Sequence, residues 1–242
     1  MTKSPIRILQ LYPTEMNMYG DYGNVLCLKK RLEWRGYDVH LLEHHPGKAL
    51  PKDVDIITGG GGQDAGQMKI KDDLQIIGSR LHALARDGTP MLMICGLYQL
   101  FGRFFKTKDG TTIPGIEIFN AETHAGPKRL IGNITTHSEQ FGDIIGYENH
   151  SGLTYLDKIQ LPLGRVTAGN GNNDRDTHEG ARYKNVIGTY LHGSLLPKNP
   201  LIADFLILQA LQKKYDVTSL DDLSTIDTIA DLARTEARTR PR

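Results

Sequence analysis

A cysteine at the junction of a strand and a helix is the residue of this chain best suited to covalent chemistry. The apolar run from Pro90 to Ile94 is typical of a short buried strand, and it stops abruptly at Cys95-Gly96. Apolar residues then follow at helical spacing, namely Leu97, Leu100 and Phe101. At such a corner the unpaired amides and the dipole of the helix lower the pKa of a thiol. The position indicates a nucleophile on a tight elbow, with a buried core cysteine as the alternative.

A thiolate mechanism also needs a group that manages protons, and His192 is the candidate. It closes the apolar stretch Val186–Leu191 and is followed by Gly193, which places it at the same sheet edge as Cys95. Nothing in the sequence directs the other eight of the nine histidines to that edge: His40, His44, His45, His82, His124, His137, His150 and His178.

Four consecutive glycines, Gly59–Gly62, come directly after a third strand-like segment at 54–58. Glycines permit positive φ and let backbone amides approach a ligand closely. The continuation Gln63-Asp64 lacks the Lys-Ser/Thr ending of a P-loop, and the spacing is not that of a dinucleotide fingerprint. The loop is therefore expected to donate an amide to an oxyanion hole, with a simple tight turn as the alternative.

The elements that position these residues alternate along the first hundred residues. Strands are predicted at 6–12, 37–42, 54–58 and 90–94, with helices from Val25 to Gly36, from Ile70 to Leu84, and after the cysteine. This order predicts an α/β fold with a mostly parallel central sheet and helices on both faces, whose sites lie beyond the carboxyl ends of the strands. Short segments at 113–119, 130–136 and 143–147 predict antiparallel strand additions.

The last third of the chain predicts further elements around the same core. The polar stretch from Gly169 to Gly180 is predicted to be a mobile loop, and Pro200 opens a helix. Weaker helical periodicity follows from Ser219 into a tail with Arg234, Arg238, Arg240 and Arg242, which is predicted to be solvated, with a role in an interface as the alternative. Without a repeat or a clear linker, residues 1–242 are expected to form a single domain with a C-terminal helical extension at about 217–242.

Composition narrows the function classes. Charged residues make up 24% of the chain and the formal net charge is +1, which gives no electrostatic case for nucleic acid or acidic membranes. No apolar run approaches the roughly 20 residues that span a bilayer, and the N-terminus does not resemble a signal peptide. Two cysteines, Cys27 and Cys95, do not make a disulfide framework and fit a reducing compartment. A cytoplasmic protein without a metal site is expected, with Cys27 as a structural residue.

Two motifs together resemble those of a known family. Ile94–Leu100 resembles the nucleophile motif of class I glutamine amidotransferases, and Gly188–Gly193 resembles the histidine motif of their cobyric acid synthase-like branch. Within this branch the chain is similar to the glutaminase subunits of bacterial lipid II isoglutaminyl synthases. The segments that carry this second similarity are Leu11–Pro13, Tyr19–Asn24, Thr58–Asp64 and Gly146–His150. The resemblance extends from about residue 6 to 205.

The resemblance implies a flavodoxin-like fold and a defined chemistry. Cys95 would attack the side-chain amide of L-glutamine, form a γ-glutamyl thioester and release ammonia, with His192 as general base and acid. The backbone amides of Gly60 and Gly96 are the candidates for the oxyanion hole. Arg129 matches the arginine that binds the α-carboxylate of glutamine, a contact that suits a guanidinium. A surface role for Arg129, or the use of the adjacent Lys128, is the alternative.

The chain departs from the broad family pattern at the third member of the triad. Many class I enzymes carry His-x-Glu, but the residue two positions after His192 is Ser194. The resemblance implies that an aspartate of a partner chain orients the imidazole, and Glu148 is a possible internal substitute. A dyad without an orienting carboxylate should be slow, so the isolated chain is predicted to be a poor glutaminase.

The chain also lacks the Walker motif that ATP-dependent activation of an acceptor would use. The resemblance implies that ATP and Mg²⁺ bind a separate MurT-like, Mur ligase-type synthetase subunit in a heterodimer. The acceptor would be membrane-bound lipid II, whose D-glutamate is amidated to D-isoglutamine. Three alternatives are another acceptor such as a cobyrinate-type corrinoid, a stand-alone γ-glutamyl hydrolase, and a non-enzymatic scaffolding subunit.

Overall fold

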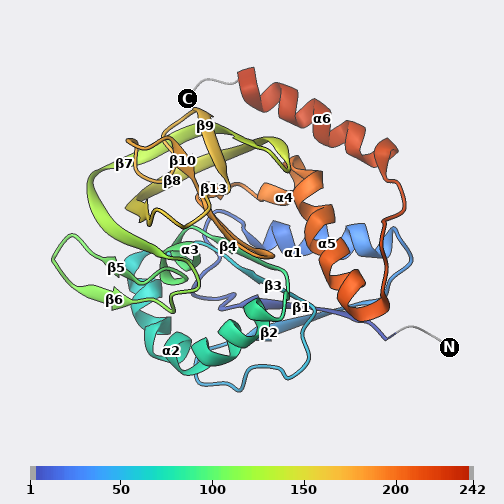
Figure 1. The fold of residues 1–242 in the computed structure, drawn as a ribbon, viewed down its shortest axis with the longest axis horizontal. Helices are drawn as coiled ribbons and strands as arrows, with labels where there is room; N and C mark the ends of the chain where they lie inside the picture. The colour runs from blue at the N-terminus through green and yellow to red at the C-terminus, as the bar shows by residue number, and fades with distance from the viewer. Residues whose placement is uncertain (1–3, 240–242) are drawn as a thin grey trace.

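The computed structural model describes residues 4–239, and its core is a six-stranded sheet of order β11-β12-β4-β3-β1-β2 (Figure 1). Its strands are β1 Ile6–Leu11, β2 Val39–His44, β3 Ile56–Gly59, β4 Met91–Ile94, β11 Ala181–Tyr183 and β12 Val186–Thr189. All neighbouring strands pair in parallel except β11 with β12. Every residue of β3, β4 and β12 is buried, because parallel strands covered on both faces need apolar side chains on both.

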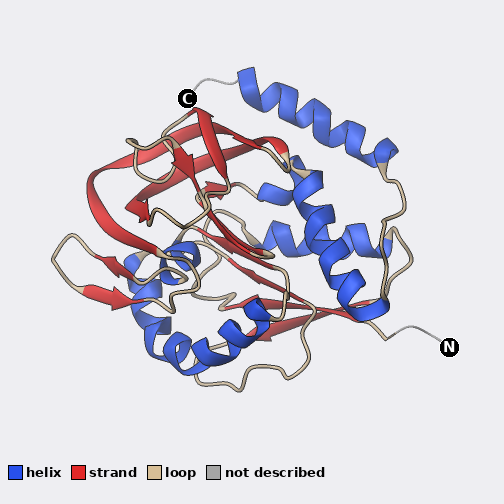
Figure 2. Ribbon diagram, viewed as in Figure 1, coloured by secondary structure: helices blue, strands red, loops and turns tan. Residues whose placement is uncertain are grey.

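Helices cover both faces of this sheet, as the sequence predicted (Figure 2). The helices of the core are α1 Tyr22–Glu33, α2 Asp64–Arg86, α3 Gly96–Leu100, α4 Leu195–Lys198 and α5 Pro200–Tyr215. The connection from β1 to β2 steps one way across the sheet and that from β3 to β4 steps the other way. Because such crossovers are right-handed, α1 and α2 lie on opposite faces, and α5 packs beside α1. The predicted α/β fold with a mostly parallel sheet is confirmed.

A second, mostly antiparallel sheet extends the core. Its strands are β5 Phe104–Lys106, β6 Thr112–Pro114, β7 Ala121–Ser138, β8 Gly142–Leu156, β9 Gly164–Ala168, β10 His178–Glu179 and β13 Leu191–His192. The predicted strands at 130–136 and 143–147 lie inside the much longer hairpin of β7 and β8. Strand β7 passes through Gly126-Pro127 by a register shift between Ala125 and Leu130, which is why it is longer than the predicted segment. Of the segment predicted at 113–119, strand β6 covers only the start.

Part of the polar stretch Gly169–Gly180 is packed in the interior, while Asp174–Thr177 are exposed. The mobility of this loop stays a prediction. Asn172 and Asn173 are fully buried. The Asn172 side chain exchanges two hydrogen bonds with the backbone of Gly180, and Asn173 Nδ2 donates to the Thr154 carbonyl of β8 at 2.8 Å. These asparagines supply polar partners that the backbone of a buried loop requires.

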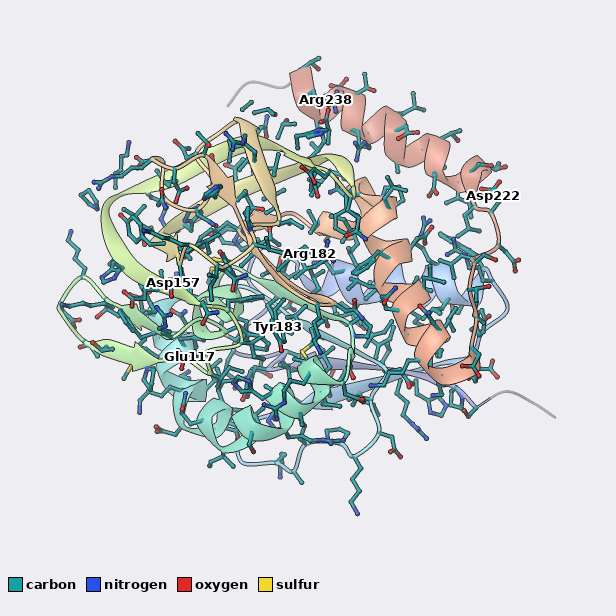
Figure 3. The ribbon with its side chains drawn as sticks, in the orientation of Figure 1. Glu117, Asp157, Arg182, Tyr183, Asp222 and Arg238 are labelled. Atoms are coloured by element: carbon teal, nitrogen blue, oxygen red, sulfur yellow. The ribbon has the colours of Figure 1, made fainter. Side chains whose placement is uncertain are left out.

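The C-terminal helix α6, Ser224–Thr239, lies along the outside of the molecule and buries none of its described side chains (Figure 1). Asp227 accepts from Arg31 of α1 at 2.5 Å, and Arg234 donates to the Asp143 carbonyl at 2.6 Å. Arg238, labelled on this helix in Figure 3, donates to the Asp143 carboxylate at 2.7 Å. Arg234 and Arg238 therefore help to attach the helix, although Arg238 remains exposed to solvent, while Arg240 and Arg242 lie outside the described residues. No helix within residues 4–239 is long and apolar enough to cross a membrane.

Candidate active site

Cys95 lies at a strained corner between β4 and α3. Its φ of 47° and ψ of −101° fall in a region that residues with a Cβ avoid. The corner is fixed on both sides, because Cys95 N donates to the Thr189 carbonyl at 2.8 Å and its own carbonyl accepts from Gln99 N at 2.9 Å. This is the geometry of a nucleophile elbow, which presents the thiol at the carboxyl edge of the sheet.

The glycine after the elbow lets the glycine-rich loop approach the cysteine. A Cβ on Gly96 would lie 2.7 Å from Met16 Cε and 3.0 Å from Gly62 N, so no larger residue fits there without displacement. Gln67 of α2 donates to the Gly96 carbonyl at 3.0 Å and fixes the elbow from the side. The loop after β3 and the elbow after β4 therefore form one packed unit.

His192 reaches the cysteine because the chain changes sheets just before it. Strand β12 belongs to the first sheet, whereas Leu191 and His192 pair with β8 in the second. The imidazole is almost completely buried, and the Tyr19 ring meets it edge-on at a centroid distance of 4.9 Å. A Cβ on Gly61 would lie 2.6 Å from His192 Cε1 and 3.2 Å from Cys95 Cβ. Cys95 and His192 thus face each other across Gly61.

A carboxylate that the sequence reasoning did not identify lies next to this pair. Asp21 Oδ1 is 3.5 Å from His192 Nδ1, slightly longer than a hydrogen bond, and Asp21 Oδ2 accepts from Gly61 N at 2.7 Å. The residue is buried in the loop between β1 and α1. The only indication of this role in the sequence is that Asp21 belongs to the loop after β1. That loop lies at the same carboxyl edge of the sheet as the elbow.

These neighbours determine the charge of the histidine. Burial lowers the pKa of His192, but the nearby Cys95 sulfur, when negatively charged, and the Asp21 carboxylate outweigh it and raise the pKa to about 10. At neutral pH the histidine is therefore an imidazolium beside the Cys95 sulfur. Such a pair holds both the nucleophile and the proton that a leaving amine requires.

Glu148, the internal carboxylate considered from the sequence, is held by a different segment. Its Oε1 accepts from the backbone and side-chain nitrogens of Asn170 at 2.9 and 2.7 Å, and its Oε2 accepts from Gly171 N at 2.9 Å. These bonds fix the packed loop after β9. The structure therefore offers Asp21 as the carboxylate at the imidazole nitrogen.

A polar pocket of about 360 Å³ opens beside the cysteine. Its lining comes from the elbow, the glycine-rich loop with the start of α2, the loop after β1, strand β5 and the β7–β8 hairpin. The residues are Met18, Tyr19, Gly62–Ala65, Gln67, Cys95, Gln99, Phe105, Arg129 and Asn149–Gly152. Arg129 lines it and donates to Asn149 Oδ1 at 2.9 Å. Lys128 instead pairs with Asp174 at 3.2 Å, outside this lining. A guanidinium thus stands in the same small cavity as the thiol.

The two glycines predicted for the oxyanion hole differ in their surroundings. Gly96 N is the first amide of α3, beside the cysteine. Gly60 packs against the backbone at Met16, because a Cβ on Gly60 would be 2.3 Å from the Met16 carbonyl oxygen. Among the described residues Gly62, rather than Gly60, is the glycine of this loop that lines the pocket. The oxyanion role of Gly60 and Gly96 stays a prediction.

Solved structures share this fold. A structure of PurLQS from Thermotoga maritima matches with a TM-score of 0.58 and 14% identity, covering 86% of this chain and 98% of that one. A crystal structure of a glutamine amidotransferase matches with a TM-score of 0.59 and 14% identity, covering 84% and 98%. At this identity the likeness concerns the fold alone.

Sequence comparison defines the family. The chain is 40% identical over 210 residues to the GatD subunit of lipid II isoglutaminyl synthase (glutamine-hydrolyzing) from Staphylococcus aureus, covering 86% of each chain. It is 39% identical to the same subunit from Streptococcus pneumoniae, covering 87% of this chain and 82% of the relative. A cobyric acid synthase from Rhizobium rhizogenes is 30% identical over 78% of this chain and 40% of its own length. Residues 7–200 match the model of the CobB/CobQ-like glutamine amidotransferase domain. The chain therefore belongs to the CobB/CobQ-like glutamine amidotransferase family.

Proposed function

We propose that this chain is the glutaminase subunit of a lipid II isoglutaminyl synthase. The observation that carries the proposal is the strained Cys95 facing His192 across Gly61, in a pocket that also holds Arg129. Two relatives about 40% identical over most of the chain bear that name. The pocket is of a size that suits a single amino acid.

The reaction follows from the position of Cys95 beside the protonated His192. The Cys95 thiolate attacks the side-chain carbonyl carbon of glutamine, and the carbonyl oxygen becomes an oxyanion that the amides of Gly60 and Gly96 stabilise. The His192 imidazolium gives its proton to the amide nitrogen, so ammonia leaves and a γ-glutamyl thioester remains. Water then attacks the thioester while His192 takes its proton, which releases glutamate and regenerates the thiolate and the imidazolium.

Arg129 acts on the substrate, and Asp21 acts on the catalytic histidine. The guanidinium binds the α-carboxylate of glutamine through charge-assisted hydrogen bonds and so directs the side-chain amide toward Cys95. Asp21 holds the Nδ1 side of the imidazole and stabilises its charge. The 3.5 Å separation is longer than a hydrogen bond, so a shift on substrate or partner binding would strengthen this contact.

The ammonia requires an acceptor activated elsewhere. A MurT-like, Mur ligase-type partner would bind ATP and Mg²⁺, activate the carboxylate of the stem-peptide D-glutamate in lipid II, and receive the ammonia to give D-isoglutamine. The heterodimer is expected to hydrolyse glutamine faster than the isolated chain. Comparing the two rates also distinguishes the carboxylates, because substantial activity of the isolated chain would favour Asp21 over an aspartate of the partner.

The decisive experiment is coexpression with a MurT-like subunit and an assay of ATP-dependent amidation of lipid II. Wild-type complex should use either glutamine or ammonium chloride as the nitrogen source. Cys95→Ala should abolish the glutamine-dependent reaction and leave the ammonia-dependent reaction intact, because only thioester formation is removed. Glutamine-dependent amidation by Cys95→Ala, or no amidation of lipid II by the wild type with either nitrogen source, would contradict the proposal.

A further inference from the structure

A second carboxylate is buried behind the candidate active site and takes no part in the mechanism above. Glu179, the last residue of β10, is completely inaccessible to solvent. Its Oε1 accepts two hydrogen bonds, one from Thr189 Oγ1 at 2.9 Å and one from Tyr190 N at 2.8 Å. Its Oε2 is a buried oxygen without a hydrogen-bond partner among the described residues. Burying such a group is costly, which calls for a physical reason for its presence.

The reason lies in the change of sheet before His192. Thr189 is the last residue of β12 in the first sheet, and Leu191 is the first residue of β13 in the second. Tyr190 lies between the two ladders, so its backbone N–H requires an acceptor from elsewhere. Glu179 supplies that acceptor. The same Glu179 oxygen orients the Thr189 hydroxyl, which in turn accepts from Leu191 N at 3.1 Å.

The braced segment is also attached to the nucleophile. The Thr189 carbonyl accepts the backbone N–H of Cys95 at 2.8 Å, and three residues after Thr189 the chain reaches His192. The side chain of Glu179 therefore fixes the backbone at Thr189 and Tyr190. This backbone bonds to Cys95 and leads directly to His192. A change in the direction of the chain at Tyr190 would move the imidazole relative to the thiol.

We propose that Glu179 is a positioning residue that sets the separation of Cys95 and His192 by bracing the switch between the two sheets. The inference rests on the proposed roles of Cys95 and His192 in glutamine hydrolysis. Glu179 is not a catalytic residue, because it is enclosed behind Thr189 and does not line the pocket.

The electrostatics of the site suggest a conservative replacement. Burial raises the pKa of Glu179 to about 8; the hydrogen bonds from Tyr190 and Thr189 oppose this, and the charge of Glu148 adds to it. At neutral pH the side chain is therefore mostly a neutral acid, whose hydroxyl is a donor. Glutamine has the same shape, keeps the accepting oxygen and also places a donor at the second position.

The test compares Glu179→Gln with Glu179→Ala in the complex with the partner. Glu179→Gln should keep kcat for glutamine hydrolysis within ~3-fold, about 0.6 kcal/mol. Glu179→Ala leaves the Tyr190 amide unpaired and should lower kcat ~100-fold, with the KM for glutamine changed less than ~3-fold, because the reacting atoms and not the binding groups are displaced. Labelling of Cys95 by a glutamine-analogue electrophile should slow in parallel.

Three further variants separate positioning from general destabilisation. Gln160→Ala removes a mostly buried side chain that bonds Asn120 N and the Leu161 and Arg182 carbonyls, and none of these residues lines the pocket. It should lower Tm without lowering kcat. If Glu179→Ala does not fold, kcat is compared between Thr189→Val and Thr189→Ser instead. Only serine keeps the hydroxyl between Glu179 and Leu191, so kcat should fall in the valine variant and stay near wild type in the serine variant.

The outcomes are distinguishable. Wild-type kcat in folded Glu179→Ala, or a rise in KM with kcat unchanged, overturns the positioning role while the proposed function stands. A loss of kcat in Gln160→Ala equal to that in Glu179→Ala, at matched Tm, also overturns it, because the effect would then be one of stability. A wild-type complex that neither hydrolyses glutamine nor becomes labelled at Cys95 overturns the proposed function itself.

Discussion

Replacing Gly61 by alanine should separate the nucleophile from its histidine without altering either side chain. The new methyl group would lie 2.6 Å from His192 Cε1 and 3.2 Å from Cys95 Cβ, whereas ordinary contacts begin at 3.4 Å. The backbone of Gly61 is not in the left-handed region, so alanine brings no conformational strain of that kind. The imidazole must therefore retreat by roughly 1 Å, a misplacement that costs ~100-fold in rate, or about 2.7 kcal/mol.

The assay is kcat/KM for glutamine in the complex with the partner, together with the rate of Cys95 labelling by a glutamine-analogue electrophile. Gly78→Ala in α2 is the matched control. Its methyl would meet only the Ile116 side chain, at 3.0 Å, and the rate should stay within ~3-fold. Thermal unfolding of both variants shows whether they are folded. A folded Gly61→Ala variant with a rate within ~3-fold of wild type would refute the inferred contact of the two residues across this glycine.

Three further outcomes are expected. Asp21→Asn should lower the pKa of His192, because Asp21 is one of the groups that raise it, and so move the alkaline limb of the pH profile of kcat/KM to lower pH; an unchanged limb would contradict the contact. Arg129→Ala should raise KM for glutamine about tenfold to a hundredfold with a smaller effect on kcat, whereas Lys128→Ala should leave KM unchanged, and equal effects of both would remove Arg129 from the binding site. Asp73→Asn should lower the free energy of unfolding by about 1–3 kcal/mol at pH 7. Burial raises the pKa of Asp73, but hydrogen bonds from a histidine, a backbone amide and a tyrosine hydroxyl outweigh it and hold the pKa below 3.8. The stabilisation is therefore present above that value and lost as pH falls through the folded pKa, so denaturant titrations at pH 7 and at pH 3 should show the difference shrinking; a constant difference would contradict the assignment.

The nucleophile, the histidine and the alternating core could be predicted because each has a local signal. A buried strand that stops at Cys95-Gly96 before a helical pattern defines an elbow within about twelve residues. His192 follows another buried strand, β12, by three residues, which brings it near the carboxyl edge of the same parallel sheet. The strand and helix order of the first hundred residues followed from periodicities of two and 3.6, and the structure confirms it.

The features that were missed depend on how distant segments pack. Asp21 has no local pattern that distinguishes it from a turn residue, and only the fold of the loop after β1 brings it to the imidazole. The length of the β7–β8 hairpin was hidden because a bulge absorbs Gly126-Pro127 within a continuous strand.

The sequence by itself determined which residues could react, because a turn, a strand end and an apolar period are properties of neighbouring residues. Only the tertiary structure decided which groups surround them. Glu179 at the sheet switch and Asp21 at the imidazole each meet their partners through long-range packing. No periodicity within a short segment encodes such contacts, since they form only when separate elements close on a shared core.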